Sequence, residues 1–187
     1  MRIVGGNFRG TKLQGPGKKG NFRPTEDQTR EALFNILAPY DGAFLDLYAG
    51  SGAVGLEAYS RGFGPITLVE RDKQSLVVLQ KNISRLLERS DTEADEVRLA
   101  KTSVQTFLKK CKDTFDVIFC DPPYGLINDD FLGKLLLDAP LAKDGILVLE
   151  HHARWLPKSI LSPWQLLKSK KYGQCALSFF QQGVTDE

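Results

Sequence analysis

The sequence has 187 residues, of which 42% are hydrophobic and 26% are charged, and its formal net charge at pH 7 is +2. These values fit one globular α/β domain with a sizeable core, and they argue against a disordered or fibrous chain. The three cysteines form no Cys–X–X–Cys pair or Cys/His cluster, so we expect neither a disulfide framework nor a metal site.

A basic, glycine-rich segment opens the chain, and we treat residues 1–22 as an extension ahead of a main domain at 23–187. Residues 1–30 carry seven basic and two acidic residues, a charge of +5, whereas the rest of the chain carries 18 basic and 21 acidic residues, a charge of −3. Such an arm favours a polyanionic partner, although a charged segment is often only solvated. Extended pieces at residues 2–4 and 12–13 can pair as a small hairpin or stay mobile without a ligand.

Neither a signal peptide nor a membrane span is expected. Residues 1–6 contain no apolar signal-peptide run, and no segment reaches the roughly 20 apolar residues that cross a bilayer. We therefore expect a cytoplasmic protein.

A helix is predicted to begin after Pro24, since Thr25 can cap its N-terminus and Gln28 can complete a capping box. An apolar stripe at helical spacing runs to residue 37, and Pro39 ends the helix.

From residue 43 onward, short apolar runs alternate with helical patterns. The expected strands lie at 43–48, 66–70, 97–100, 115–120 and 145–150, and the expected helices at 53–61, 73–88, 103–111 and 129–138. This alternation predicts an α/β fold with a doubly wound, mostly parallel sheet. Near the end of the chain, two further runs at 164–167 and 176–180 flank a turn-like segment, which predicts an antiparallel hairpin at one edge of the sheet.

A glycine-rich turn, Gly50-Ser51-Gly52-Ala53-Val54-Gly55, follows the first expected strand and opens a helix. This arrangement lets a ligand approach bare backbone at the carboxyl end of the sheet. The spacing also fits a dinucleotide fingerprint with Glu70 as its acid, so an NAD-dependent oxidoreductase stays an alternative. Asp46 favours a different ligand, because a carboxylate there would repel a pyrophosphate. The ammonium and sulfonium groups of S-adenosylmethionine would suit Asp46, and its ribose hydroxyls would suit Glu70.

Two further residues each have two possible roles. Ser103 follows the third strand, where it can contact an adenine amino group, cap the next helix, or do both. Arg71 can cover one adenine face with its stem or lie on the surface.

The fourth strand ends in Asp121-Pro122-Pro123-Tyr124. Two consecutive prolines remove two backbone donors, so the turn presents a carboxylate and a bare carbonyl side by side. Such an acceptor pair suits an –NH₂ group, and Tyr124 offers a flat face for a planar ring. An exocyclic amine of a base is a poor nucleophile, because its lone pair is delocalised into the ring. Holding both hydrogens would localise that lone pair, so orientation and electrostatics would supply most of the rate of methyl transfer.

These motifs together resemble the class I, Rossmann-like methyltransferases, and the form Asp121-Pro122-Pro123-Tyr124 resembles members that act on amino nitrogens of bases. More narrowly, Arg2-Ile3-Val4-Gly5-Gly6, Arg9-Gly10 with Leu13, and the segment 23–35 resemble the bacterial RsmD family, which methylates the N2 amino group of one guanine in 16S ribosomal RNA. The resemblance covers nearly the whole chain. It implies a seven-stranded sheet, S-adenosylmethionine as cofactor, and an N-terminal extension near the substrate.

The resemblance also implies roles for individual residues. The catalytic residues would be Asp121, Pro122 and Tyr124, which hold the guanine. The cofactor would contact Asp46, Gly50 and Gly52 through its methionine moiety, Glu70 through its ribose, and Arg71 and Ser103 at its adenine, with Thr25 closing the site. Ser103 stands where the family more commonly has Asp or Asn. Phosphate contacts would come from Arg2, Arg9, Lys12 and Arg23.

The expected partner is 16S rRNA in an assembled or partly assembled small ribosomal subunit, bound by a monomer without a metal ion. The choice of guanine over adenine as the target base rests on the resemblance alone, so methylation of N6 of adenine is an alternative. The sequence has no separate DNA-recognition domain, which counts against adenine in DNA as the target. Methylation of a protein glutamine more often uses Asn in place of Asp121. A non-catalytic RNA-binding protein would not need an intact Asp121 and Tyr124.

Overall fold

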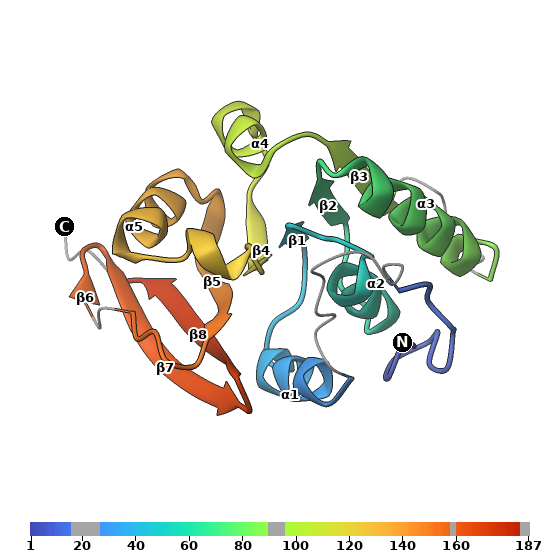
Figure 1. The fold of residues 1–187 in the computed structure, drawn as a ribbon, viewed down its shortest axis with the longest axis horizontal. Coiled ribbons are helices and arrows are strands. Elements are labelled where there is room, and N and C mark those ends of the chain that lie inside the picture. The colour runs from blue at the N-terminus through green and yellow to red at the C-terminus, as the bar shows by residue number, and fades with distance from the viewer. Residues whose placement is uncertain (16–26, 90–95, 158–159, 184–187) are drawn as a thin grey trace.

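The computed structural model describes residues 1–15, 27–89, 96–157 and 160–183 (Figure 1). The helices are α1 (Asp27–Leu37), α2 (Ala53–Ser60), α3 (Lys73–Leu87), α4 (Val104–Lys110), the short 3₁₀ helix η2 (Tyr124–Leu126) and α5 (Asp129–Asp138). The strands are β1 (Phe44–Leu47), β2 (Ile66–Glu70), β3 (Val97–Lys101), β4 (Phe115–Cys120), β5 (Leu141–His152), β6 (Ile160–Leu161), β7 (Trp164–Tyr172) and β8 (Cys175–Gln182). None of the helices in these ranges is long and apolar enough to cross a membrane.

The strands form one sheet in the order β3-β2-β1-β4-β5-β8-β7-β6. Strands β1 to β5 are parallel to one another, and β8 joins β5 in the antiparallel direction. The predicted doubly wound sheet and its hairpin, now β7 and β8, are confirmed. The sheet contains the expected seven strands and one more, since the two-residue strand β6 pairs with the start of β7.

Helices cover both faces of the parallel part of the sheet, as Figure 1 shows for α1 and α2 on one side and α4 and α5 on the other. On the first face, residues of α1, α2 and α3 pack on strand residues such as Phe44 and Phe119. On the second face, α4 and α5 pack on residues such as Leu47 and Ile118. Because side chains alternate along a strand, neighbouring positions pack in the two cores in turn, which explains why these strands are largely apolar.

Strand β5 is longer than predicted. Lys143-Asp144-Gly145 has the composition of a turn, yet the strand begins at Leu141, which pairs with Phe115. The register then shifts before Val117 pairs with Ile146, and Asp144 has a positive φ of 64°. The turn-like residues thus form an irregularity within the strand.

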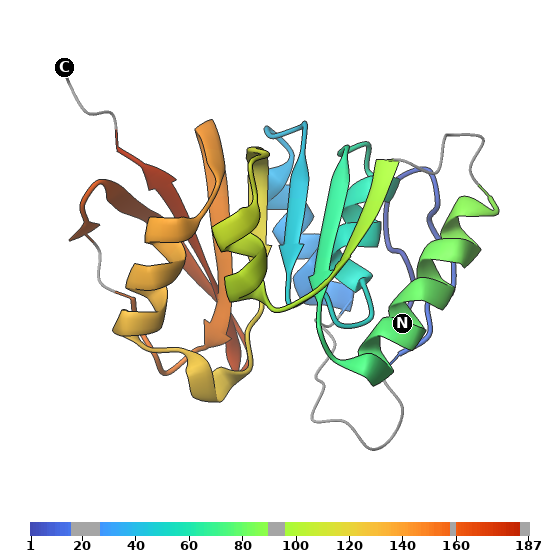
Figure 2. The ribbon, with the colours of Figure 1, turned by 90° about the horizontal axis from the view of Figure 1, so that it is seen from above.

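The N-terminal hairpin is also present, since Arg2 and Lys12 form an antiparallel bridge. Figure 2 shows this blue segment lying alongside α3. Its backbone contacts α2 and α3 through polar side chains described below. The predicted cap residue Thr25 lies outside the described residues, and α1 begins at Asp27.

Candidate active site

Four carboxylates share one face of the sheet at the carboxyl ends of its parallel strands. They come from β2, β1, the residue after β4, and β5, which are neighbours in that order: Glu70, Asp46, Asp121 and Glu150. Each stands two positions after a core residue of the α1–α3 face, namely Leu68, Phe44, Phe119 and Val148. The side chains therefore lie on that same face.

The strand order reverses between β1 and β4, and open α/β sheets bind their ligands at such a point. Asp46 pairs in register with Phe119 of the neighbouring strand. Asp121 therefore lies two residues further toward the carboxyl ends of the strands. The Asp121 amide donates to the carbonyl of Leu47 at 3.3 Å, which continues the pairing of β1 and β4 beyond the last strand residue. The glycine turn and the Asp121–Tyr124 turn are therefore adjacent.

The glycine turn depends on residues with left-handed backbone. Gly50 and Gly52 have φ values of 57° and 80°, and Tyr48, just before them, has a φ of 63°. A Cβ at Gly52 would meet the side chain of Leu79. Only glycine adopts this conformation without strain, and at Gly52 it also leaves room for the side chain of Leu79. Helix α2 starts directly after Gly52, so the positive end of its dipole lies at the carboxyl ends of the parallel strands.

Asp46 is buried beneath the start of α2, where its Oδ2 accepts a hydrogen bond from the Gly55 amide at 2.9 Å. Burial raises the pKa of Asp46 to about 7; the hydrogen bond from Gly55 opposes this rise, and the charge of Glu70 adds to it. A buried carboxylate without a cation beside it is costly to ionise. The carboxylate of Asp46 therefore suits a positively charged ligand, whereas it would repel a pyrophosphate.

Glu70 organises the loop on the other side of Asp46. Its Oε2 accepts from the Gly50 amide at 2.8 Å, and its Oε1 accepts from the amides of Arg71 and Asp72 at 2.7 Å each. Carboxylate oxygens have further lone pairs, so Glu70 can still accept hydrogen bonds from hydroxyl groups.

The turn after β4 follows Cys120 directly. Pro122 is buried, Pro123 is exposed, and Tyr124 begins η2 with a half-buried ring. That ring meets the edge of His152 from β5 at a centroid distance of 5.8 Å and an interplanar angle of 87°.

Burial raises the pKa of Asp121 well above its usual value, and the charges of Glu150 and Asp46 raise it further. The carboxyl group of Asp121 is thus sensitive to any charge that binds at this edge. Despite the acidic row, no group of three or more His, Cys, Asp or Glu within the described ranges could hold a metal ion.

Ser103 and Arg71 lie where the sequence predicts them. Ser103 caps α4, since its Oγ accepts from the Thr106 amide at 3.1 Å. Its role as a helix cap is therefore confirmed, while contact with a ligand stays a prediction. The side chain of Arg71 is exposed next to Glu70.

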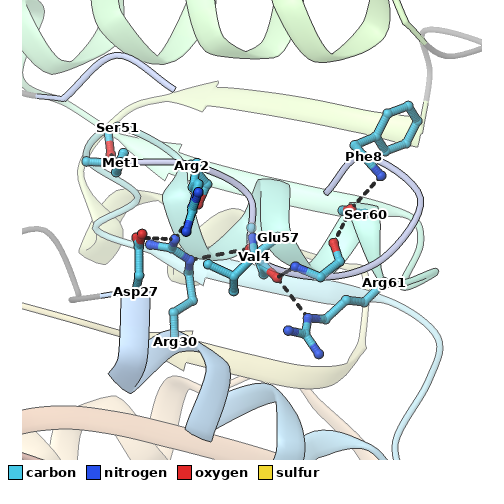
Figure 3. A network of polar contacts seen from close by, with 12 residues as sticks. Met1, Arg2, Val4, Phe8, Asp27, Arg30, Ser51, Glu57, Ser60 and Arg61 are labelled. Carbon is cyan, nitrogen blue, oxygen red and sulfur yellow. Dashed lines mark hydrogen bonds and ion pairs between the residues drawn. The ribbon is translucent and has the colours of Figure 1, made fainter. Parts of the chain in front are cut away.

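A buried ionic network fastens the N-terminal hairpin to α1 and α2 (Figure 3). The carboxylate of Glu57, fully buried in α2, accepts from the amides of Val4 and Gly5 at 2.8 and 2.7 Å. It also pairs with Arg61 Nε at 2.9 Å and with Arg30 Nε at 3.4 Å. Arg30, itself fully buried, donates to Asp27 at 2.7 Å and to the carbonyl of Arg2.

Asn82 of α3 joins the same hairpin to the glycine turn. Its side chain donates to the carbonyls of Gln14 and Ser51 at 3.0 and 2.9 Å and accepts from the Gln14 amide at 2.8 Å. The end of the hairpin and the glycine turn are thus held by one fully buried amide.

The basic residues of the hairpin are exposed, but they do not all lie near the acidic row. The amide of Phe8 donates to Ser60 at the end of α2, so Arg9 lies about 12 Å, one helix length, from the glycine turn. Arg2 and Lys12 lie together at the bridge between the two arms. Arg23, like Thr25, lies outside the described residues.

Sequence reasoning missed Glu57, Asn82 and Glu150. A signal for Glu57 existed, because it is the one acidic residue among apolar and small neighbours in Ala53–Ser60, a helix buried along its whole length. Asn82 stands in an amphipathic helix where a polar residue ordinarily faces water, so its position gave no such signal.

Comparisons with known proteins agree with the expected family. The chain matches the family model described as conserved hypothetical protein 95 over residues 1–181. It is 35% identical to the ribosomal RNA small subunit methyltransferase D of Escherichia coli (strain K12), across 100% of this chain and 92% of that protein. It is 29% identical to the putative rRNA methyltransferase YlbH of Bacillus subtilis (strain 168), across 97% and 99%. Among solved structures, the putative methyltransferase yhhF from Escherichia coli is 34% identical with a TM-score of 0.80, covering 99% of both chains.

Proposed function

Because this chain belongs to the family described as conserved hypothetical protein 95, we propose that it transfers a methyl group from S-adenosylmethionine to the N2 amino group of a guanine in small-subunit ribosomal RNA. The observation that carries the proposal is the position of the Asp121–Tyr124 turn. It lies on the strand next to Asp46 and the glycine turn, and the carboxylates of both sites share one face of the sheet.

S-adenosylmethionine, when bound, would supply an electrophilic methyl group and two positive charges. Asp46 and the glycine turn would hold its methionine moiety, Glu70 its ribose, and Ser103 and Arg71 its adenine, with Thr25 closing the site. The buried carboxylate of Asp46 fits such a cation. A cation at this edge would also lower the raised pKa values of Asp46 and Asp121.

Asp121 and the carbonyl of Pro122 would accept the two hydrogens of the amine, and Tyr124 would stack on the base. Asp121 need not remove a proton before attack, because the nitrogen becomes acidic as the methyl group transfers. The residues of this turn would therefore act by orientation and electrostatic stabilisation. The base must leave its stack to reach Tyr124, which costs a few kcal/mol and is easiest in a loop.

The experiment that tests the function is transfer of tritiated methyl groups to small ribosomal subunits that lack the modification, followed by nucleoside analysis. N2-methylguanosine is the expected product. N6-methyladenosine would identify adenine as the target. Binding of NADH without binding of S-adenosylmethionine would overturn the proposal.

The affinity for S-adenosylmethionine should depend on pH near the raised pKa of Asp46, about 7. Below that pH Asp46 is neutral and loses its attraction for the ammonium group, so binding should weaken as pH falls from 7.5 to 5.5. This range stays below the pKa of an α-amino group, about 7.7 to 8.0. Calorimetric titration would measure the effect, and Asp46→Asn should bind weakly with a flat pH profile.

The same variant provides a second, independent measurement. A raised pKa means that neutral Asp46 stabilises the fold, and this contribution is lost as pH rises through about 7. Without cofactor, Asp46→Asn should therefore gain stability over the wild type at pH 8 more than at pH 5. Parallel stability curves would show that Asp46 does not titrate in this range.

We propose that residues 1–22 serve as an RNA-binding arm on a methyltransferase domain at 23–187, in a cytoplasmic monomer that acts on assembled or partly assembled subunits. Arg2, Arg9, Lys12 and Arg23 would contact phosphates. The exposed positions of Arg2, Arg9 and Lys12 support this role.

Changing Arg9 and Lys12 together to alanine should weaken RNA binding and make its salt dependence shallower. Each phosphate contact contributes roughly 0.7 to 0.9 to the slope of log K against log salt concentration. Filter binding at several salt concentrations would measure that slope. The exposed residues Lys109 and Lys110 at the end of α4 provide the matched control. An unchanged slope in the Arg9/Lys12 variant would remove these residues from the interface.

A further inference from the structure

Glu150 is the nearest carboxylate neighbour of Asp121 in the sheet. Cys120 of β4 pairs in parallel register with Leu149 of β5, so the following residues, Asp121 and Glu150, stand side by side. Neighbouring strands lie about 4.8 Å apart, and both side chains lie on the α1–α3 face. The side chain of Glu150 is 5% exposed.

The electrostatics agree with this placement. After burial, the charge of Glu150 contributes most to raising the pKa of Asp121, ahead of that of Asp46. Two carboxylates thus lie close together at the place proposed for the base, although each raises the energetic cost of ionising the other.

The two purine bases present different groups beside their amines. Guanine has the N1–H donor next to its N2 amino group, whereas adenine has the bare N1 acceptor next to its N6 amino group. A second carboxylate beside Asp121 would accept N1–H from guanine, and it would face the lone pair of adenine. The arrangement therefore matches a base with two adjacent donor groups.

We propose that Glu150 accepts the N1–H of the target base and thereby selects guanine over adenine. This inference rests on the proposed function, and it assigns a specificity-determining residue within the same site.

The test compares guanine with 2-aminopurine at the target position of a small subunit reconstituted from ligated RNA. The 2-aminopurine base keeps the amine that accepts the methyl group, but its N1 carries a lone pair in place of a hydrogen. Methylation rates would be measured for the wild type, Glu150→Gln, and the exposed control Glu88→Gln.

The wild type should prefer guanine strongly, and Glu150→Gln should reduce the guanine-to-2-aminopurine ratio about 10- to 100-fold. The amide can donate to N1 of 2-aminopurine, so this variant should methylate 2-aminopurine faster than the wild type does. A residue with only a structural role would lower both rates and leave the ratio unchanged. Circular dichroism and the affinity for S-adenosylmethionine would show that the variant is folded.

An unchanged ratio in Glu150→Gln would overturn the inference and leave the proposed function intact. Absence of guanine methylation by the wild type would instead remove the proposed function. Glu150→Asp, which keeps the charge but shortens the side chain, should lower the rate on guanine while retaining discrimination against 2-aminopurine.

Discussion

Replacing Asp121 with alanine should slow methyl transfer to ribosomal RNA by about 10²- to 10³-fold or more, while the affinity for S-adenosylmethionine changes little. Alanine removes the acceptor that holds one hydrogen of the amine, so the nitrogen lone pair is no longer aimed at the methyl carbon. The cofactor contacts proposed for Asp46 and Glu70 lie on other strands and remain. Single-turnover rates together with calorimetric affinities would separate the two effects.

Asp121→Asn separates the acceptor from the charge, because asparagine keeps one oxygen but cannot become negative. Its rate should lie between those of the wild type and Asp121→Ala. The wild-type rate should also fall as pH is lowered through the raised pKa of Asp121, whereas the rate of Asp121→Asn should lose that dependence. Asp138→Asn, at the end of α5, provides a control on an exposed carboxylate. Near-normal turnover by Asp121→Ala would refute the assigned role.

The helix and strand positions could be predicted closely because both faces of the sheet are covered. Ile66–Glu70 and Phe115–Cys120 were predicted at the same bounds that the structure shows. In such strands nearly every side chain is buried, so the bounds of the apolar run in the sequence match the bounds of the strand. The error at Leu141–His152 has a local cause, since Lys143-Asp144-Gly145 is compatible with a turn, whereas Leu141 before it and Ile146 after it both pair with β4.

The motifs of the site could be predicted because each is contiguous in the sequence. Asp46 lies four residues before Gly50, and Asp121 to Tyr124 is a single turn. Glu150 gave no comparable signal, because its relation to Asp121 depends on the register of two strands that α5 separates in the sequence. The contacts of the N-terminal hairpin with α2 and α3 could not be predicted for the same reason, since they join residues far apart in the sequence. Glu57 bonds to Val4 across 53 positions and Asn82 to Gln14 across 68.

The structure also shows where the basic residues of the N-terminal arm lie relative to the glycine turn. Its charge predicted RNA contact, but a charge count does not say where the residues lie. The structure places Arg9 at the end of α2 remote from the glycine turn. RNA contacted by Arg9 would therefore lie away from the glycine turn, so Arg9 would contribute to affinity and orientation and would not touch the reacting group.

The buried network around Glu57 should contribute strongly to stability. Glu57→Ala would leave Arg30 with less compensation in a fully buried position and would deprive the Val4 and Gly5 amides of their acceptor. Breaking one partner of a buried ion pair typically costs about 3–5 kcal/mol. Denaturant unfolding would measure this loss, and hydrogen exchange should show faster exchange at the Val4 and Gly5 amides.

Lys134→Ala is the matched control, because its pair with Asp130 joins two exposed side chains and should contribute less than about 1 kcal/mol. Combining Arg30→Met with Glu57→Gln should cost less than the sum of the two single changes, since the double variant removes both fully buried charges of the pair. If Glu57→Ala destabilised the protein no more than Lys134→Ala, the hairpin would be held mainly by its apolar residues and by the contacts of Asn82 and Ser60. In that case Ile3 and Leu13, which are buried in the core beside α1 and α2, would be the apolar residues that anchor it.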